Sequence, residues 1–139
     1  MKKTISILLL SLIITSCSKS DSENSSSANN KSFHPPAWIQ GTWVQFYGNI
    51  SSGSGYKFTS DNVCQVISGG QTCYKELLNT YDNSNIEVNV NESINTNNEY
   101  KFSWTIQAST VKLHFKKGTD NKTIFQVYEG VGDIPLTKQ

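Results

Sequence analysis

Few residues in this chain have side chains suited to catalysis or metal binding: it has three cysteines and two histidines. His114 falls on the polar side of an alternating segment, which predicts a solvent-exposed side chain, and His34 precedes two prolines, where it could cap the end of a domain. Metal sites need several ligands at short spacings, and a Gly-x-Ser-x-Gly nucleophile motif is absent. We therefore predict no catalytic centre, metal or cofactor. A carboxylate pair brought together only by folding is the one catalytic arrangement left open.

Cys17 ends an N-terminal segment with the layout of a targeting signal. Two lysines precede an apolar run over residues 5–14, which is shorter than the about 20 residues that a membrane-spanning helix needs. The sequence Ile14-Thr15-Ser16-Cys17 resembles the lipobox of bacterial lipoproteins, in which the cysteine thiol receives a diacylglyceryl group. The resemblance implies that residues 1–16 are a signal peptide and that Cys17 carries acyl chains such as palmitate. We expect these chains to hold the protein to the outer membrane, facing either the periplasm or the cell surface.

Residues 17–32 are expected to form a lipidated, flexible tether. After the cysteine they contain no large apolar side chain, so they cannot bury enough surface to become ordered. Residues 19–23 are similar to the acidic stretch that sends some Bacteroidota lipoproteins to the cell surface, and a plain solvated leader is the alternative. Without residues 1–16, ten of the twelve lysines remain against eleven acidic residues, with no arginine. This balance predicts no nucleic-acid partner.

Residues 33–139 are expected to form one small all-β domain. In the clearest segment, Tyr100, Phe102 and Trp104 alternate with polar residues, which predicts a strand with one apolar face. Similar short runs, separated by turn residues every eight to twelve positions or so, are typical of a sandwich or barrel. We expect eight strands, at residues 43–47, 56–59, 63–67, 72–78, 86–90, 100–106, 111–115 and 123–128. Residues 75–78 could instead form a single helical turn.

Cys64 and Cys73 are expected to form a structural disulfide, because an exported protein folds where thiols oxidise. A two-residue turn at Ser68 and Gly69 would place the two cysteines opposite each other as a non-hydrogen-bonded pair, with Cα atoms about 4.5 Å apart. A turn at residues 69–70 would instead place Lys75 opposite Cys64. We predict the first turn.

The triplet Gly41-Thr42-Trp43, placed before this strand pattern, resembles the Gly-x-Trp start of the lipocalins, and in particular the short lipocalin-like lipoproteins of Bacteroidota. The resemblance implies a small eight-stranded antiparallel barrel of the calycin type. In lipocalins an arginine from a late strand covers this tryptophan. Since the chain has no arginine, that contact is either absent or made by a lysine such as Lys112 or Lys138.

An eight-stranded barrel has room for its own side chains or for one small ligand. Six aromatic residues are expected on the inner face, where they either line a ligand cavity or fill the interior: Trp43, Phe58, Tyr100, Phe102, Trp104 and Phe115. Because each aromatic side chain can bury about 150–250 Å², we favour a packed interior.

Two functions follow from these expectations. The first is a non-catalytic binding module, which holds a small apolar ligand or an envelope protein. The second rests on residues 52–56, which are similar to the Ser-Gly-x-x-Tyr loop of periplasmic lysozyme inhibitors. That resemblance implies that Ser52, Gly53 and Tyr56 enter the cleft of a lysozyme. A structural or assembly role has no positive mark in the sequence, and an enzyme is not expected.

Overall fold

The computed structural model describes residues 31–139. Cys17, the predicted signal peptide and most of the predicted tether lie outside the described residues. The described part contains nine strands: β1 (Gly41–Tyr47), β2 (Ile50–Phe58), β3 (Val63–Ile67), β4 (Gly70–Cys73), β5 (Val88–Asn95), β6 (Glu99–Ile106), β7 (Ser109–Lys117), β8 (Thr123–Tyr128) and β9 (Gly132–Lys138). It also contains two helices, η1 (Ala37–Ile39) and α1 (Tyr74–Asn83).

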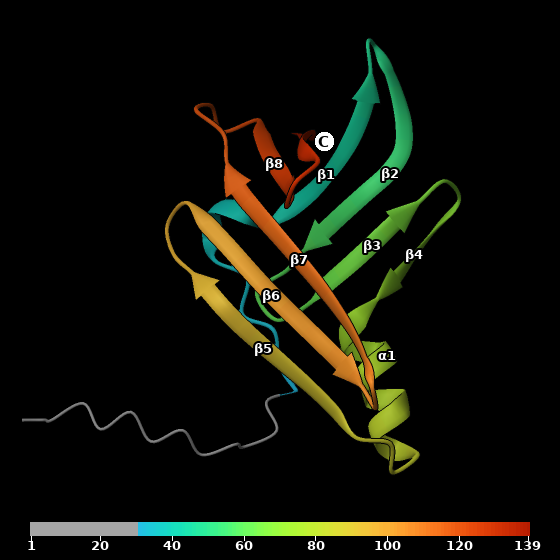
Figure 1. The fold of residues 1–139 in the computed structure, drawn as a ribbon. Coiled ribbons are helices and arrows are strands. Elements are labelled where there is room, and N and C mark those ends of the chain that lie inside the picture. The colour runs from blue at the N-terminus through green and yellow to red at the C-terminus, as the bar shows by residue number, and fades with distance from the viewer. Residues whose placement is uncertain (1–30) are drawn as a thin grey trace, which may run out of the picture.

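All nine strands join one antiparallel sheet in the order β4-β3-β2-β1-β9-β8-β7-β6-β5. The sheet curls into a half-barrel, so that β6 and β7 pass in front of β2 and β3 in Figure 1. The helix α1 contacts β3, β4 and β5, and it therefore lies beside both edge strands of the sheet. The prediction of an all-β, barrel-like domain is confirmed, and the predicted number of eight strands is wrong.

The additional strand is β9, which lies beyond the last expected strand and has Pro135 at its centre. Proline cannot donate a backbone hydrogen bond, so it is restricted to strand positions where no donor is needed. β9 is paired with β1 only at Thr137 and Lys138. At Pro135 the strand pairs with β8 alone, and this one-sided pairing allows the proline.

Residues 72–78, expected to form one strand, divide between the end of β4 and the beginning of α1. Tyr74, Leu78 and Tyr81 are spaced by four and by three, which is the spacing of one face of a helix. Tyr74 and Leu78 are buried in the core, and Tyr81 packs against it. The alternative of a helical turn at residues 75–78 is therefore confirmed, although α1 extends over ten residues.

The interior of the half-barrel is filled by aromatic side chains. Phe58 and Phe115 meet edge to face with ring centroids 5.1 Å apart, and Tyr56 meets Phe115 in the same way at 5.1 Å. Five of the six predicted inner-face aromatics are at most 2% exposed: Trp43, Phe58, Tyr100, Phe102 and Phe115. Trp104 is half-buried at the margin of this core and packs on Tyr74 at 5.2 Å. The aromatic rings occupy the space in which an open barrel would hold a ligand.

The segment before β1 is fastened to the core and to β5. The Phe33 ring is fully buried and meets Phe102 edge to face at 5.5 Å. The Glu92 carboxylate accepts hydrogen bonds from the backbone N–H of His34 (2.7 Å) and from the hydroxyl of Tyr100 (2.5 Å), and it lies 3.0 Å from His34 Nδ1. Asn95 donates a further hydrogen bond to the His34 carbonyl at 2.8 Å. His34 therefore holds this segment against the strands.

Gly41 and Trp43 lie where the first strand meets the last. The Nζ atom of Lys138 is 5.2 Å from the centroid of the Trp43 ring, within the range of a cation–π contact. Gly41 has φ +127°, and a Cβ atom on this residue would lie 2.8 Å from Lys138 Cε. The glycine thus leaves room for the lysine side chain above the tryptophan. The sequence left open whether the contact that covers this tryptophan is absent or is made by a lysine such as Lys112 or Lys138. In the structure Lys138 makes it.

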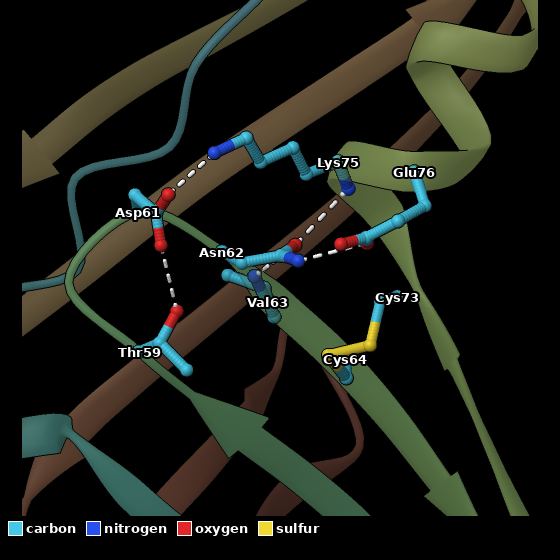
Figure 2. Close-up of a disulfide and its surroundings, with 8 residues drawn as sticks. All are labelled: Thr59, Asp61, Asn62, Val63, Cys64, Cys73, Lys75 and Glu76. Atoms are coloured by element: carbon cyan, nitrogen blue, oxygen red, sulfur yellow. Dashed lines mark hydrogen bonds and ion pairs between the residues drawn. A yellow bond between two sulfur atoms is a disulfide. The ribbon is translucent and has the colours of Figure 1, made fainter.

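Cys64 and Cys73 lie opposite each other in the β3–β4 ladder, in which Ile67 pairs with Gly70. This register is the one predicted from a turn at residues 68–69. A disulfide joins the two cysteines, whose Cα atoms are 3.8 Å apart (Figure 2). The bridge ties β3 to the residue that immediately precedes α1.

Asn62 holds the beginning of α1 beside this disulfide (Figure 2). The N-cap residue of α1 is Cys73, which makes no side-chain capping hydrogen bond. Instead, Asn62 Oδ1 accepts hydrogen bonds from the backbone N–H groups of Lys75 (3.0 Å) and Val63 (2.8 Å). Its Nδ2 group donates to Glu76 Oε2 at 2.8 Å. A buried residue between β2 and β3 therefore performs the capping that the N-cap residue does not.

Candidate functional site

The sheet loosens where β7 meets β8. Their ladder consists of Phe115, Lys116 and Lys117 paired with residues 124–126, whereas β6 pairs with β7 from end to end. β7 continues well away from β8 toward α1 in Figure 1. One hollow lies beside this seam, and a second is lined by residues of β1, β2, β3, β8 and β9; Tyr128 lines both of them.

The larger hollow is a groove on the outer face of β5, β6 and β7, with a volume of about 500 Å³. Lys101 alternates with the buried residues Tyr100 and Phe102, so it points away from the core. The polar side chains of this outer groove are Asn91, Ser93, Lys101, Ser103, Lys112, His114, Tyr128 and Glu129. Phe102, Leu113 and Val127 complete the lining, so three neighbouring strands, the end of β8 and the turn after it provide a concave surface that is partly polar and partly apolar.

The charges in the outer groove are concentrated on two lysines and one glutamate. Lys101 Nζ lies 2.9 Å from Glu129 Oε1, joining β6 to the turn after β8. The hydrogen bond from Lys101 and its positive charge lower the pKa of Glu129, and His114 and Lys112 add smaller effects in the same direction. Lys112 is exposed and makes no ion pair within residues 31–139.

His114 differs from its prediction as a solvent-exposed residue. It is on the outer face, as the alternation indicates, but only 13% of its side chain is exposed, because it lies in the wall of the outer groove. Its Nε2 atom is 2.6 Å from Glu99 Oε1. Its Nδ1 atom is buried and has no hydrogen-bond partner among the described residues.

The smaller hollow, with a volume of about 170 Å³, lies on the inner face beyond the aromatic core. Its polar lining is uncharged and consists of Gln45, Ser54, Tyr56, Gln65, Gln126 and Tyr128. Gln126 Nε2 donates a hydrogen bond to the Tyr56 hydroxyl at 3.1 Å, and both residues are buried. Burial raises the pKa of Tyr56, so its hydroxyl stays protonated at neutral pH. This inner hollow offers neutral donors and acceptors only.

The residues predicted to form an inhibitory loop belong to a strand. Ser52, Gly53 and Tyr56 all lie within β2, where residues 52–54 bulge between two paired positions. Tyr56 is 8% exposed and faces the aromatic core, because the strand alternation turns it inward. It cannot enter the cleft of another protein without leaving that core. The prediction of a protruding loop is therefore wrong.

The described residues show two further features. None of the helices in the described part of the chain has the length and apolar character needed to cross a membrane. Within residues 31–139, no three or more His, Cys, Asp or Glu side chains are grouped so that they could hold a metal ion.

No family model, no curated protein and no solved structure matches this chain.

Alternation along the sequence places Lys112 and His114 on one polar face, but it does not indicate a groove. Alternation also places Lys101 and Ser103 on that face, so most of the lining was implicit in the pattern. Tyr128 reaches the groove from the end of β8, and Glu129 from the turn that follows it. The expected strand at residues 123–128 indicates a turn after Tyr128, but no local signal indicates that this turn lies beside β6.

Proposed function

We propose that this chain is a lipid-anchored lipoprotein of the cell envelope whose lipocalin-like, calycin-type domain is a non-catalytic binding module. In this proposal Cys17 carries the acyl anchor in the outer membrane, and the domain binds an envelope partner or ligand at its surface. The anchor rests on the lipobox-like sequence before Cys17 and on the polar residues that follow it. Two or more acyl chains suffice for stable membrane attachment.

The packed interior is the observation that carries the binding proposal. Buried aromatic rings pack against one another in the interior of the half-barrel, and the two hollows described above lie beside this core. A small apolar ligand would have to displace aromatic rings that pack edge to face with their centroids 5.1 Å apart. The geometry therefore favours a polar envelope partner over a small apolar ligand.

The contact between Lys138 and Trp43 supports the lipocalin-like assignment. In the lipocalins, which the Gly-x-Trp triplet resembles, an arginine from a late strand covers the tryptophan of the first strand. Here Lys138 of the last strand occupies that place, and Gly41 provides the space for it. The cation is a lysine rather than an arginine, and the sheet has nine strands.

The anchor is tested by metabolic labelling with a palmitate analogue. We expect the full chain to incorporate the label and to partition into detergent, and we expect Cys17→Ser to lose both properties. A labelled Cys17→Ser protein would contradict the proposed anchor.

Binding is tested with the full chain purified in detergent. We expect retention of a polar envelope fraction, such as isolated surface polysaccharide or cell-wall material, and no uptake of a fluorescent fatty acid. Saturable uptake of the fatty acid would replace this proposal with the small-ligand alternative. Failure to retain any envelope fraction would remove the support for a binding module.

A further inference from the structure

We infer that the outer groove binds an acidic saccharide, with Lys101 and Lys112 receiving the sugar carboxylate. This inference rests on the proposed binding function and adds a site and a ligand class to it. It depends on the charge of the groove, on an ion pair inside it that a ligand can replace, and on the neutral groups around that ion pair.

The two lysines are placed to act on one carboxylate. Lys101 pairs with His114 across β6 and β7, and Ser103 pairs with Lys112. Lys101 and Lys112 are therefore diagonal neighbours on the same face of two adjacent strands, about 7–8 Å apart at their Cα atoms. Their flexible side chains can converge on one anion, and hydrogen bonds from an ammonium to a carboxylate are among the stronger ones in proteins.

Glu129 already places a carboxylate on Lys101. Its side chain is 80% exposed, and it comes from the turn after β8 rather than from a strand. Exposed ion pairs of this kind contribute little to stability, so the carboxylate of a ligand can take the place of Glu129. The position of Glu129 Oε1, 2.9 Å from Lys101 Nζ, marks where that carboxylate would lie.

The remaining lining suits a sugar ring. Asn91, Ser93 and Ser103 provide amide and hydroxyl groups from adjacent strands, which match the hydroxyl groups at the edge of a ring. Tyr128 is 42% exposed and lines the groove, where its aromatic ring can contact the C–H groups of a sugar. A volume of about 500 Å³ lies within the usual range of ligand sites. Phe102, Leu113 and Val127 also line the groove and add apolar contacts for the C–H groups of a sugar ring.

Isothermal titration of the full chain in detergent micelles tests the inference. The probes are an oligogalacturonate, the matching neutral galactose oligomer and an oligoglutamate peptide of similar charge. We expect the oligogalacturonate to bind about tenfold more tightly than the neutral oligomer, and Lys101→Met or Lys112→Met to weaken it about tenfold. Glu129→Gln removes the internal competitor and is expected to strengthen binding. Added salt should weaken binding.

Lys116→Met is the matched control. Lys116 is an exposed lysine on the same strand and face as Lys112, but it lies outside the lining, so its removal changes the net charge equally without altering the groove. We expect this variant to bind the oligogalacturonate as the unchanged protein does. Thermal unfolding of each variant separates a loss of binding from a loss of folding.

Three results would overturn the inference. Equal affinity for the neutral and acidic oligomers would exclude a carboxylate site, while leaving the binding module in place. Tighter binding of the oligoglutamate would replace the saccharide with an acidic peptide. An equal loss of affinity in the Lys116→Met control would show that net charge, and not the outer groove, attracts the ligand. If the protein also retains no envelope fraction, the proposed function itself fails.

Discussion

Replacing Asn62 with alanine should destabilise the domain more than any exposed substitution, because this side chain caps α1 from outside the helix. Two backbone N–H groups, of Val63 and Lys75, depend on its Oδ1 atom. Loss of a helix cap costs about 1 kcal/mol, and leaving a buried donor such as the Val63 N–H unpaired costs about 1–3 kcal/mol more. We therefore expect Asn62→Ala to lower the free energy of unfolding by about 2–4 kcal/mol.

Urea unfolding followed by far-ultraviolet circular dichroism measures this loss. With a slope of about 2 kcal/mol per molar urea, the midpoint should fall by about 1–2 M. Asn89→Ala is the control, because Asn89 is exposed on β5, and we expect it to change the free energy of unfolding by less than about 0.5 kcal/mol. The helical signal should fall with the midpoint, since α1 loses its cap.

Exchanging the amide of Asn62 and the carboxylate of Glu76 gives a sharper test of the capping role. Asn62→Asp keeps the acceptor for both N–H groups but places a second carboxylate 2.8 Å from where Glu76 now accepts a hydrogen bond. Adding Glu76→Gln restores a donor opposite that carboxylate, so the double variant should recover at least half of the stability lost in Asn62→Asp. An Asn62→Ala loss below about 0.5 kcal/mol, or a double variant no more stable than Asn62→Asp, would refute the argument.

Three further predictions concern the disulfide, the outer groove and the first two strands. Cys64 and Cys73 are nine positions apart, and reducing the bond between them should lower the free energy of unfolding by about 2.7 kcal/mol in the chain-entropy estimate. Urea unfolding with and without reductant measures this loss, and equal midpoints would contradict the prediction. Lys101 holds the pKa of Glu129 in the folded protein below the ordinary pKa of a glutamate. The stabilisation from their contact is therefore present above the ordinary pKa and is lost as the pH falls through the lowered pKa of the folded protein. An NMR titration should show that low midpoint, and Lys101→Met should raise it; an unchanged midpoint would disprove the pairing. Gly55→Ala should abolish the cooperative unfolding transition, because its Cβ would lie 1.9 Å from a carbonyl oxygen of β1; a normal transition would show that β1 and β2 can separate there.

The sequence predicted the features of the fold that depend on neighbouring residues. The pairing of Cys64 with Cys73 follows from a two-residue turn, which fixes the register of the hairpin without reference to the rest of the sheet. The inward direction of Tyr100 and Phe102 likewise follows from alternation along one strand. The strand β9 does not follow from its sequence alone, because Pro135 fits a strand only where no second strand needs its backbone donor.

The site was less predictable because it depends on where two strands stop pairing. Alternation places Lys101 and Lys112 on one face, but it does not indicate that the ladder between β7 and β8 ends at Phe115. Nor does it indicate that Glu129 reaches back to Lys101. The prediction for His114 fails for the same reason. Alternation correctly places this residue on the polar face, but its exposure depends on the groove around it.

The packing of the core explains why the outer groove is suited to reversible binding. The inner faces of β6 and β7 are fixed by buried rings, including Phe102 and Phe115, so the backbone beneath Lys101 and Lys112 is rigid and their spacing is maintained. Glu129 instead belongs to an exposed turn with no buried residue, in which Val131 is 89% exposed. This part can move while the core stays packed. Exchange of the internal carboxylate for that of a ligand therefore requires movement of the turn alone.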